Sequence, residues 1–270
     1  MSYGSAYFQA VTHLTETIYH DTYEFISPKK LNLRGTSVFI TGASKGIGRE
    51  TALSFAVAGC AKIGLGARSD LSKLEAEVKE AAKKAGHKEE PKVVKVKLDV
   101  ASQESVKAAA ETVSKEFGGK EVNVKGVFLC SKYFMPLVLA GEVKTNIIVS
   151  SIGAIDTQFG ASSYQSTKFA VCRMAEFIAV EYHDKGLVCF AVHPGGLKTE
   201  LAVGMPPELH HYLVDELPLP GHCITWLGSA NRPWLNGRFV SVNWDMKELE
   251  AKKDEIVEGD LLKFRLITAV

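Results

Sequence analysis

The stretch SVFITGASKGIG, residues 37–48, decides the fold class of this chain. Its first five residues form a short β-branched run typical of a buried strand, and residues 49–59 have the apolar spacing of an amphipathic helix. Between them, glycines let backbone amides and the helix amino terminus approach a pyrophosphate, because no side chain intervenes. The stretch therefore predicts a strand, a phosphate-binding turn and a helix. The residues of the turn that we expect to hold a dinucleotide are Gly42, Ser44, Lys45, Gly46, Ile47 and Gly48.

Strand-like and helix-like runs alternate along the rest of the chain. Such alternation builds a parallel sheet with helices on both faces, so we expect a single domain with a doubly wound, Rossmann-like α/β fold. The predicted strands span residues 37–41, 61–67, 93–100, 145–151, 186–192 and 237–243. The predicted helices after the first span residues 70–85, 102–117 and 163–185.

Two segments lie outside this alternation. Residues 1–34 form an N-terminal extension, and residues 245–270 are predicted to form a charged helix followed by a short strand. The dinucleotide-binding domain lies between them, at residues 35–244. We expect both ends to serve in packing or capping.

Composition limits the class of partner. The chain is 46% hydrophobic and 23% charged, and 32 Lys and Arg residues against 31 Asp and Glu residues give a net charge of +1. This balance provides no long-range field for nucleic acid or an anionic membrane, and no segment approaches the roughly 20 apolar residues that span a bilayer. A small-molecule partner is therefore expected, and the composition leaves a homo-oligomer open.

The cysteines and the N-terminal segment indicate a compartment. The cysteines are odd in number, include no C-x-x-C pair and mostly lie in apolar runs, which is typical of reduced core residues. Residues 1–34 lack the basic start and apolar centre of a signal peptide. We therefore expect a cytoplasmic protein. The five cysteines are Cys60, Cys130, Cys172, Cys189 and Cys223.

The residue after the second predicted strand indicates which dinucleotide binds. An acidic residue there would accept hydrogen bonds from a ribose 2′-hydroxyl, but this chain has Arg68, whose guanidinium can pair with a 2′-phosphate. Lys45 in the glycine turn is a second cation. The two cations favour NADP over NAD; the alternative is that both are solvated surface charges.

The glycine turn also contains the pattern of a different enzyme class. Its letters G-A-S-K-G match the G-x-S-x-G nucleophile elbow of hydrolases, in which Ser44 would be the nucleophile. That elbow normally follows several strands and does not require Gly48, whereas here the pattern follows the first strong strand. The hydrolase is therefore the weaker alternative.

Candidate catalytic residues lie at the start of the helix predicted at residues 163–185. Tyr164 and Lys168 are four residues apart, so their side chains project from one helix face. An ammonium beside a tyrosine favours the phenolate, as a general acid or base requires. Ser151, at the end of the preceding strand, is placed to hold a substrate oxygen.

Histidines are interpreted as structural. His193 closes an apolar strand, where a satisfied core histidine is more common than a catalytic base. His210 and His211 are adjacent, and neighbours in a helix or strand do not face one ligand. We therefore predict no metal site.

These motifs resemble those of the short-chain dehydrogenase/reductase family over roughly residues 32–243. TGASKGIG looks like the glycine motif of the family and YQSTK like its Y-x-x-x-K motif, and the separation of Ser151 from Tyr164 (164 − 151 = 13) is the usual family spacing. LDV, HPGGLKT and EVNVKGVFL resemble three further family segments. The C-terminal ANRPWLNGRFVSVNWD and the long N-terminal lead are similar to fungal members, but this similarity names no substrate.

The resemblance implies an NADP-dependent oxidoreductase that moves a hydride between nicotinamide and a ketone or secondary alcohol. In the family mechanism Tyr164 is the general acid or base, Lys168 holds the nicotinamide ribose and tunes Tyr164, and Ser151 orients the carbonyl. Asn123 matches the fourth catalytic residue, which anchors a water chain that supplies protons. The implied cofactor contacts are Arg68, Asp99 and Val100 on the adenosine side and Tyr164, Lys168, Pro194, Gly195, Leu197 and Thr199 on the nicotinamide side.

Part of the family pattern is absent between Phe117 and Glu121. The family has its fourth strand and an N-N-A-G turn there, so the loss is about 30 residues, of the order of one β-α unit. The flanking strands could pair directly, leave a gap, or recruit EVNVKGVFL as a substitute strand.

The absence bears on activity, since misplacement by 1 Å can cost about a hundredfold. We interpret it as a skipped exon or a misjoined gene model rather than a specialised isoform. A catalytically impaired NADP-binding protein is therefore the alternative function.

Overall fold

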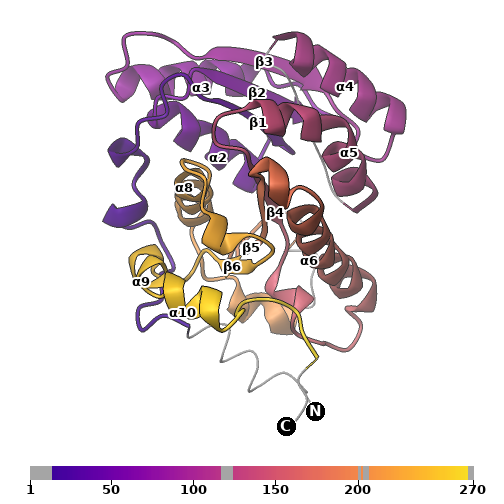
Figure 1. Cartoon of the computed structure of the whole chain (residues 1–270). Coiled ribbons are helices and arrows are strands. Elements are labelled where there is room, and N and C mark those ends of the chain that lie inside the picture. Colours follow the sequence, from indigo (N-terminus) through magenta and orange to yellow (C-terminus); the bar gives the residue numbers. More distant parts are fainter. Residues whose placement is uncertain (1–13, 117–123, 200–201, 203–206, 267–270) are drawn as a thin grey trace.

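The computed structural model describes residues 14–116, 124–199, 202 and 207–266 (Figure 1). The doubly wound α/β class is confirmed, because short parallel strands alternate with helices along the chain. The strands are β1 Ser37–Thr41, β2 Lys62–Ala67, β3 Lys92–Lys97, β4 Thr145–Val149, β5 Val188–His193 and β6 Phe239–Ser241. The main helices are α2 Gly46–Val57, α3 Ser72–Lys84, α4 Gln103–Glu116, α5 Val124–Ala140, α6 Ser162–Glu181, α8 Pro218–Leu227, α9 Met246–Ala251 and α10 Lys253–Glu258.

The strands form two sheets of three, ordered β1-β2-β3 and β4-β5-β6. Every pairing is parallel; Ile40 lies opposite Leu65 in the first sheet and Ile147 opposite Phe190 in the second. Among the described residues, β1 pairs only with β2 and β4 only with β5. A doubly wound sheet of the Rossmann type has the order 3-2-1-4-5-6, so the break falls where its fourth strand would lie between β1 and β4.

This arrangement decides between the three outcomes that the sequence left open. The strands on either side of the break do not pair, and a gap separates the two sheets. The substitute strand is wrong from Val124 onward, because the residues of EVNVKGVFL from that point belong to α5. The remaining part of that segment lies outside the described residues.

Helices bridge the two sheets in place of strand pairing (Figure 1). On one side α2, which packs on β1 and β2, also packs on α8, and the approach is close: a Cβ on Gly221 would lie 2.7 Å from Glu50 Cγ. Elsewhere α5 places Phe134 against Phe39 of β1, with ring centroids 5.4 Å apart, while Met135 joins the core beneath β4 and β5. Burial of these apolar faces therefore holds the halves together.

The N-terminal segment is part of the second core rather than a loose appendage. Ile26 is completely buried there, and Ile18 forms an antiparallel bridge with Trp244. Tyr19 N–H donates to Asn243 O at 2.8 Å, and Asn243 Nδ2 donates back to Tyr19 O at 3.0 Å. The described part of this segment thus pairs by backbone hydrogen bonds with the residues that follow β6.

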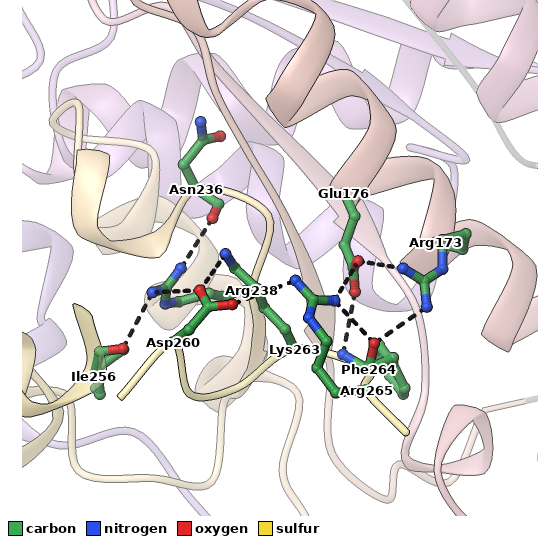
Figure 2. A network of polar contacts seen from close by, with 9 residues as sticks. All are labelled: Arg173, Glu176, Asn236, Arg238, Ile256, Asp260, Lys263, Phe264 and Arg265. Carbon is green, nitrogen blue, oxygen red and sulfur yellow. Dashed lines mark hydrogen bonds and ion pairs between the residues drawn. The ribbon is translucent and has the colours of Figure 1, made fainter. Parts of the chain in front are cut away.

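The C-terminal segment differs from its prediction. Instead of one charged helix it forms α9 and α10, and the predicted short strand is absent from residues 261–266. A polar network ties this tail to α6 (Figure 2). The nearly buried Glu176 carboxylate accepts bonds from Arg173 Nη1 at 2.5 Å, Arg265 Nη1 at 2.9 Å and Phe264 N at 3.1 Å. The tail is therefore fixed to the helix that carries Tyr164.

Two further expectations concern burial and membranes. All five cysteines are buried, as predicted for core residues. Within the described part of the chain, no helix combines the length and the apolar character that crossing a bilayer requires.

Candidate functional site

The predicted cradle lies between β1 and α2, and its backbone requires glycine. Gly42 and Gly46 have φ values of +61° and +55°, in the left-handed region that side chains disfavour. A Cβ on Gly48 would lie 2.5 Å from the carbonyl oxygen of Gly42, closer than any real contact. The turn is therefore drawn tightly around the amino terminus of α2, as close approach of a pyrophosphate demands. Ser44 and Ile47 are half-buried in this turn, and Lys45 is exposed.

The loop after β5 reaches the glycine turn. Thr199 Cγ2 lies 3.8 Å from the ideal Cβ position of Gly46, so the two cofactor segments predicted from separate motifs are brought together. Pro194 and Gly195 form the half-buried turn of this loop, and Leu197 is buried. This contact also joins a segment from each sheet.

The adenosine-side candidates follow the neighbouring strands. Arg68 is exposed directly after β2 and forms no ion pair with any residue that the structure describes. Asp99 follows β3, where its Oδ1 accepts from Ala101 N at 2.9 Å and its own N–H donates to Ser105 Oγ at 2.9 Å. Val100 beside it is half-buried. Because parallel strands end at the same edge, these residues share the edge that carries the glycine turn.

Tyr164 and Lys168 lie in the first turns of α6, as predicted. The Lys168 ammonium sits 5.8 Å from the centre of the Tyr164 ring and donates to Val149 O at 3.1 Å. Burial lowers the pKa of Lys168, and the neighbouring Cys172 opposes that effect. The Tyr164 side chain remains 41% exposed, so it is accessible to a ligand. Lys168 therefore joins the tyrosine to the end of β4.

The structure separates the roles of the two adjacent serines. Ser150 is buried, donates to Lys168 O at 2.9 Å and lies 3.0 Å from Cys172 Sγ, so it is a packing residue. Ser151 is half-buried after β4, and its Oγ accepts from Gly153 N at 3.1 Å. That bond uses the oxygen as acceptor and leaves the Ser151 O–H hydrogen as a donor.

The Ser151 turn is held against α6 by a residue that the sequence did not single out. Gln165 Oε1 accepts from Gln158 N at 2.9 Å, and Gln165 Cγ lies 3.2 Å from the ideal Cβ position of Gly153. The helix and the turn that carry Tyr164 and Ser151 are thus packed together. Gln165 follows Tyr164 directly, and only the folded turn shows its role.

His193 behaves as the structural residue that was predicted. Its Nδ1 accepts from Ile152 N at 3.1 Å, which places the proton of the neutral ring on Nε2. Burial lowers the pKa of His193 to about 4, although the Asp215 carboxylate opposes the shift. A neutral histidine therefore supports the residue next to Ser151. The remaining catalytic candidate, Asn123, lies outside the described residues.

A family profile described as short chain dehydrogenase matches residues 36–120 and 119–209. The chain belongs to the short-chain dehydrogenase/reductase family. Short chain dehydrogenase mpl6 of Monascus purpureus is 43% identical over 277 residues, covering 92% of this chain and 94% of the relative. Short chain dehydrogenase pigC of Monascus ruber is 39% identical over 286 residues, covering 94% of each. The similarity to fungal members of the family is therefore confirmed.

Solved structures show the same short-chain dehydrogenase/reductase fold. A short-chain type dehydrogenase/reductase from Mycobacterium ulcerans superposes with a TM-score of 0.67 at 16% identity, covering 85% of this chain and 99% of that one. The 3-oxoacyl-[acyl-carrier protein] reductase from Brucella melitensis, solved in complex with NAD, gives a TM-score of 0.66 at 16% identity, with coverages of 77% and 95%. At this identity the likeness concerns the fold alone.

The comparisons also bear on chain length. The alignments with the two Monascus proteins run over 277 and 286 residues, which exceeds the 270 residues of this chain. These relatives therefore contain residues that have no counterpart here. The family profile, in turn, matches in two segments that meet at residues 119–120.

Proposed function

We propose that this chain is built as an NADP-dependent oxidoreductase that reduces a ketone or oxidises the corresponding secondary alcohol, with Tyr164 as general acid and base. One observation carries the proposal: the Lys168 ammonium is half-buried between the Tyr164 ring and the carbonyl oxygen of Val149, at the strand end that presents Ser151. A cation held there has no partner carboxylate to neutralise it among the described residues, so its charge acts on the tyrosine.

The residues of the cradle fit a dinucleotide. The positive φ values of Gly42 and Gly46 and the close approach at Gly48 suit a pyrophosphate, and Thr199 borders the same turn. Arg68 would pair with a 2′-phosphate, and Asp99 and Val100 would border the adenine. Gly195 and Leu197 would contact the nicotinamide. When bound, the nicotinamide supplies or accepts the hydride.

The proton is handled by side chains of this chain. Ser151 donates its O–H hydrogen to the substrate oxygen and so fixes the orientation of the carbonyl. Tyr164 Oη gives its proton to that oxygen in reduction and takes it back in oxidation. Lys168 stabilises the phenolate that remains. Asn123 is proposed to anchor the water chain that returns a proton to the site.

We further propose that the chain lacks one β-α unit at the junction near residue 120. The two matched segments of the family profile meet there, the relatives contain extra residues, and β1 and β4 do not pair. Low turnover is the expected consequence, because the glycine turn belongs to one sheet and the tyrosine to the other. The alternative function is an NADP-binding protein without appreciable activity. For the hydrolase, Ser44 makes no side-chain hydrogen bond to a histidine among the described residues.

Two substitutions test the proposal. Tyr164→Phe should abolish any reductase turnover with nearly unchanged NADPH affinity, since only the proton donor is lost. Arg68→Asp should weaken NADPH binding by about tenfold or more while NADH binding changes little, since a charge-assisted pair is worth about 1.5–3 kcal/mol. Equal losses for the two cofactors would contradict the NADP assignment, and retained turnover would exclude Tyr164 as the acid.

A further inference from the structure

The loop after β5 is held by one carboxylate that no sequence motif marked. Asp215 Oδ2 accepts from Gly196 N at 2.5 Å, and Asp215 N donates to Gly196 O at 2.9 Å. Leu197 pairs with Asp215 as a parallel bridge. The loop is therefore fixed by both the side chain and the backbone of one residue.

The fit between this loop and its support leaves little room. A Cβ on Gly195 would lie 2.6 Å from Asp215 Oδ2, and a Cβ on Gly196 would lie 2.0 Å from Tyr212 O. Gly195 also has a φ of +87°, which a side chain would disfavour. A shift of Asp215 would thus be transmitted directly to the backbone of the loop.

Asp215 is in turn held by His20 of the N-terminal segment and by Asn243 after β6. His20 Nδ1 lies 2.6 Å from Asp215 Oδ1, and Asn243 Nδ2 donates to the same oxygen at 2.9 Å. Because an ionised carboxylate only accepts, the histidine nitrogen is the donor. The His20 backbone oxygen also accepts from Glu216 N at 2.9 Å. The Asp215 side chain is 4% exposed, whereas that of His20 is 60% exposed, so the N-terminal segment closes the carboxylate off from water.

We propose that Asp215 and His20 are positioning residues for the cofactor loop of residues 194–199, so that the bond from His20 to Asp215 supports nicotinamide binding. The proposal rests on the proposed function, since the loop matters for catalysis only if it borders the nicotinamide. Without the His20 bond, Asp215 Oδ1 keeps only the hydrogen bond from Asn243 among the described side chains. The carboxylate can then shift, and Gly196 N–H loses an acceptor in a fixed position. The N-terminal segment is then a part of the site and not merely a cap on the core.

The chain contains a matched control. Glu248 accepts from Glu16 N at 2.7 Å and from Thr17 Oγ1 at 2.7 Å, and so holds the same N-terminal segment. It belongs to α9 and makes no hydrogen bond to the loop after β5 among the described residues. Glu248→Ala therefore loosens the segment without touching Asp215.

The test compares His20→Ala, His20→Asn and Glu248→Ala, first by hydrogen exchange of the cofactor-free protein. We expect faster exchange of peptides covering residues 194–199 in His20→Ala only. His20→Asn should restore slow exchange, because its amide Nδ2 can donate where Nδ1 did. NADPH affinity, followed by cofactor fluorescence, should fall about tenfold in His20→Ala and remain near wild type in the other two variants.

Two results would overturn the inference: unchanged loop exchange in His20→Ala, or equal acceleration in His20→Ala and Glu248→Ala. Asp215→Ala should show a larger effect of the same kind, provided that its thermal unfolding stays cooperative. If the wild-type chain binds no NADPH, the proposed function fails, but the exchange comparison still decides whether His20 fixes the loop.

Discussion

The outer edge of the first sheet and the two strands that border the break are built differently. The outer strand β3, KVVKVK, carries Lys92, Lys95 and Lys97, and lysines are a common protection of sheet edges against further pairing. The inner strands β1, SVFIT, and β4, TNIIV, have no charged residue. Their sequences are those of central strands, although they stand at edges.

Burial shows the same contrast. In the middle strands β2 and β5 nearly every residue is buried, whereas β1 has one buried residue, Ile40, and β4 has two, Asn146 and Ile148. The half-covered side chains of β1 and β4 leave apolar area that a further strand or helix would bury. The contrast is consistent with the proposal that one further strand belongs between β1 and β4.

The largest expected effect comes from adding a strand between β1 and β4. Inserting a family-like β-α segment between Gly119 and Lys120 should let one strand pair with both β1 and β4. We expect reductase turnover to appear and the melting temperature to rise, because the glycine turn and Tyr164 would then be fixed in one sheet. The measurement is NADPH oxidation over a panel of ketones and aldehydes, together with thermal unfolding.

The control insert is a glycine and serine linker of the same length, which relieves the junction without providing a strand. It should leave turnover low. Robust turnover by the 270-residue chain itself would show that the break is compatible with catalysis. In that case the proposed loss of a β-α unit would not explain any functional deficit.

Many of the helices and strands could be predicted from the sequence because their signals are local. Strand 37–41 coincides with β1, and the Tyr164 and Lys168 pair lies on the predicted helix, since apolar periodicity and four-residue spacing depend only on neighbours. The break was also visible in the order of motifs. How the two sheets are held together across the break depends on the packing of α2, α5 and α8, and no local sequence pattern predicts that packing.

The residues that support the loop after β5 could not be predicted from the sequence, because their contacts are not local. His20, Asp215 and Asn243 come from three distant parts of the sequence and meet only in the folded chain. Each is an ordinary polar residue in its local context. The short strand predicted after the charged C-terminal helix does not form at residues 261–266, where contacts of Phe264 and Arg265 with Glu176 fix the chain without strand pairing.

The second prediction concerns whether the sheet β1-β2-β3 and the sheet β4-β5-β6 unfold independently. Phe134→Ala should cost about 3–5 kcal/mol of unfolding free energy, since the ring is fully buried against Phe39 of the first sheet. Leu235→Ala removes an equally buried side chain from the core of the second sheet and should cost about 2–5 kcal/mol. Without strand pairing across the break, we expect each variant to raise hydrogen exchange first in its own sheet.

Peptides from β2 and from β5 report the two halves separately. If both variants accelerated exchange equally in both sheets, the molecule would unfold as one unit, and helix packing alone would couple the halves as tightly as a continuous sheet does.

The smallest of the three effects concerns pH and the second half alone. Burial lowers the pKa of His193 to about 4 in the folded chain, whereas an unfolded histidine has a pKa near 6.5. Between these values the unfolded state binds more protons than the folded state. The contribution of His193 to the unfolding free energy is therefore fully present above pH 6.5 and is lost as the pH drops toward 4, by up to about 3 kcal/mol.

The variant His193→Asn keeps an acceptor for Ile152 N–H but does not titrate. Its denaturant midpoint should therefore fall less than that of the wild type between pH 7 and pH 4.5. His222, whose pKa burial also lowers, is present in both proteins, so its contribution cancels in the comparison. Identical acid losses in the two proteins would contradict the prediction, because they would mean that the fold does not keep His193 neutral.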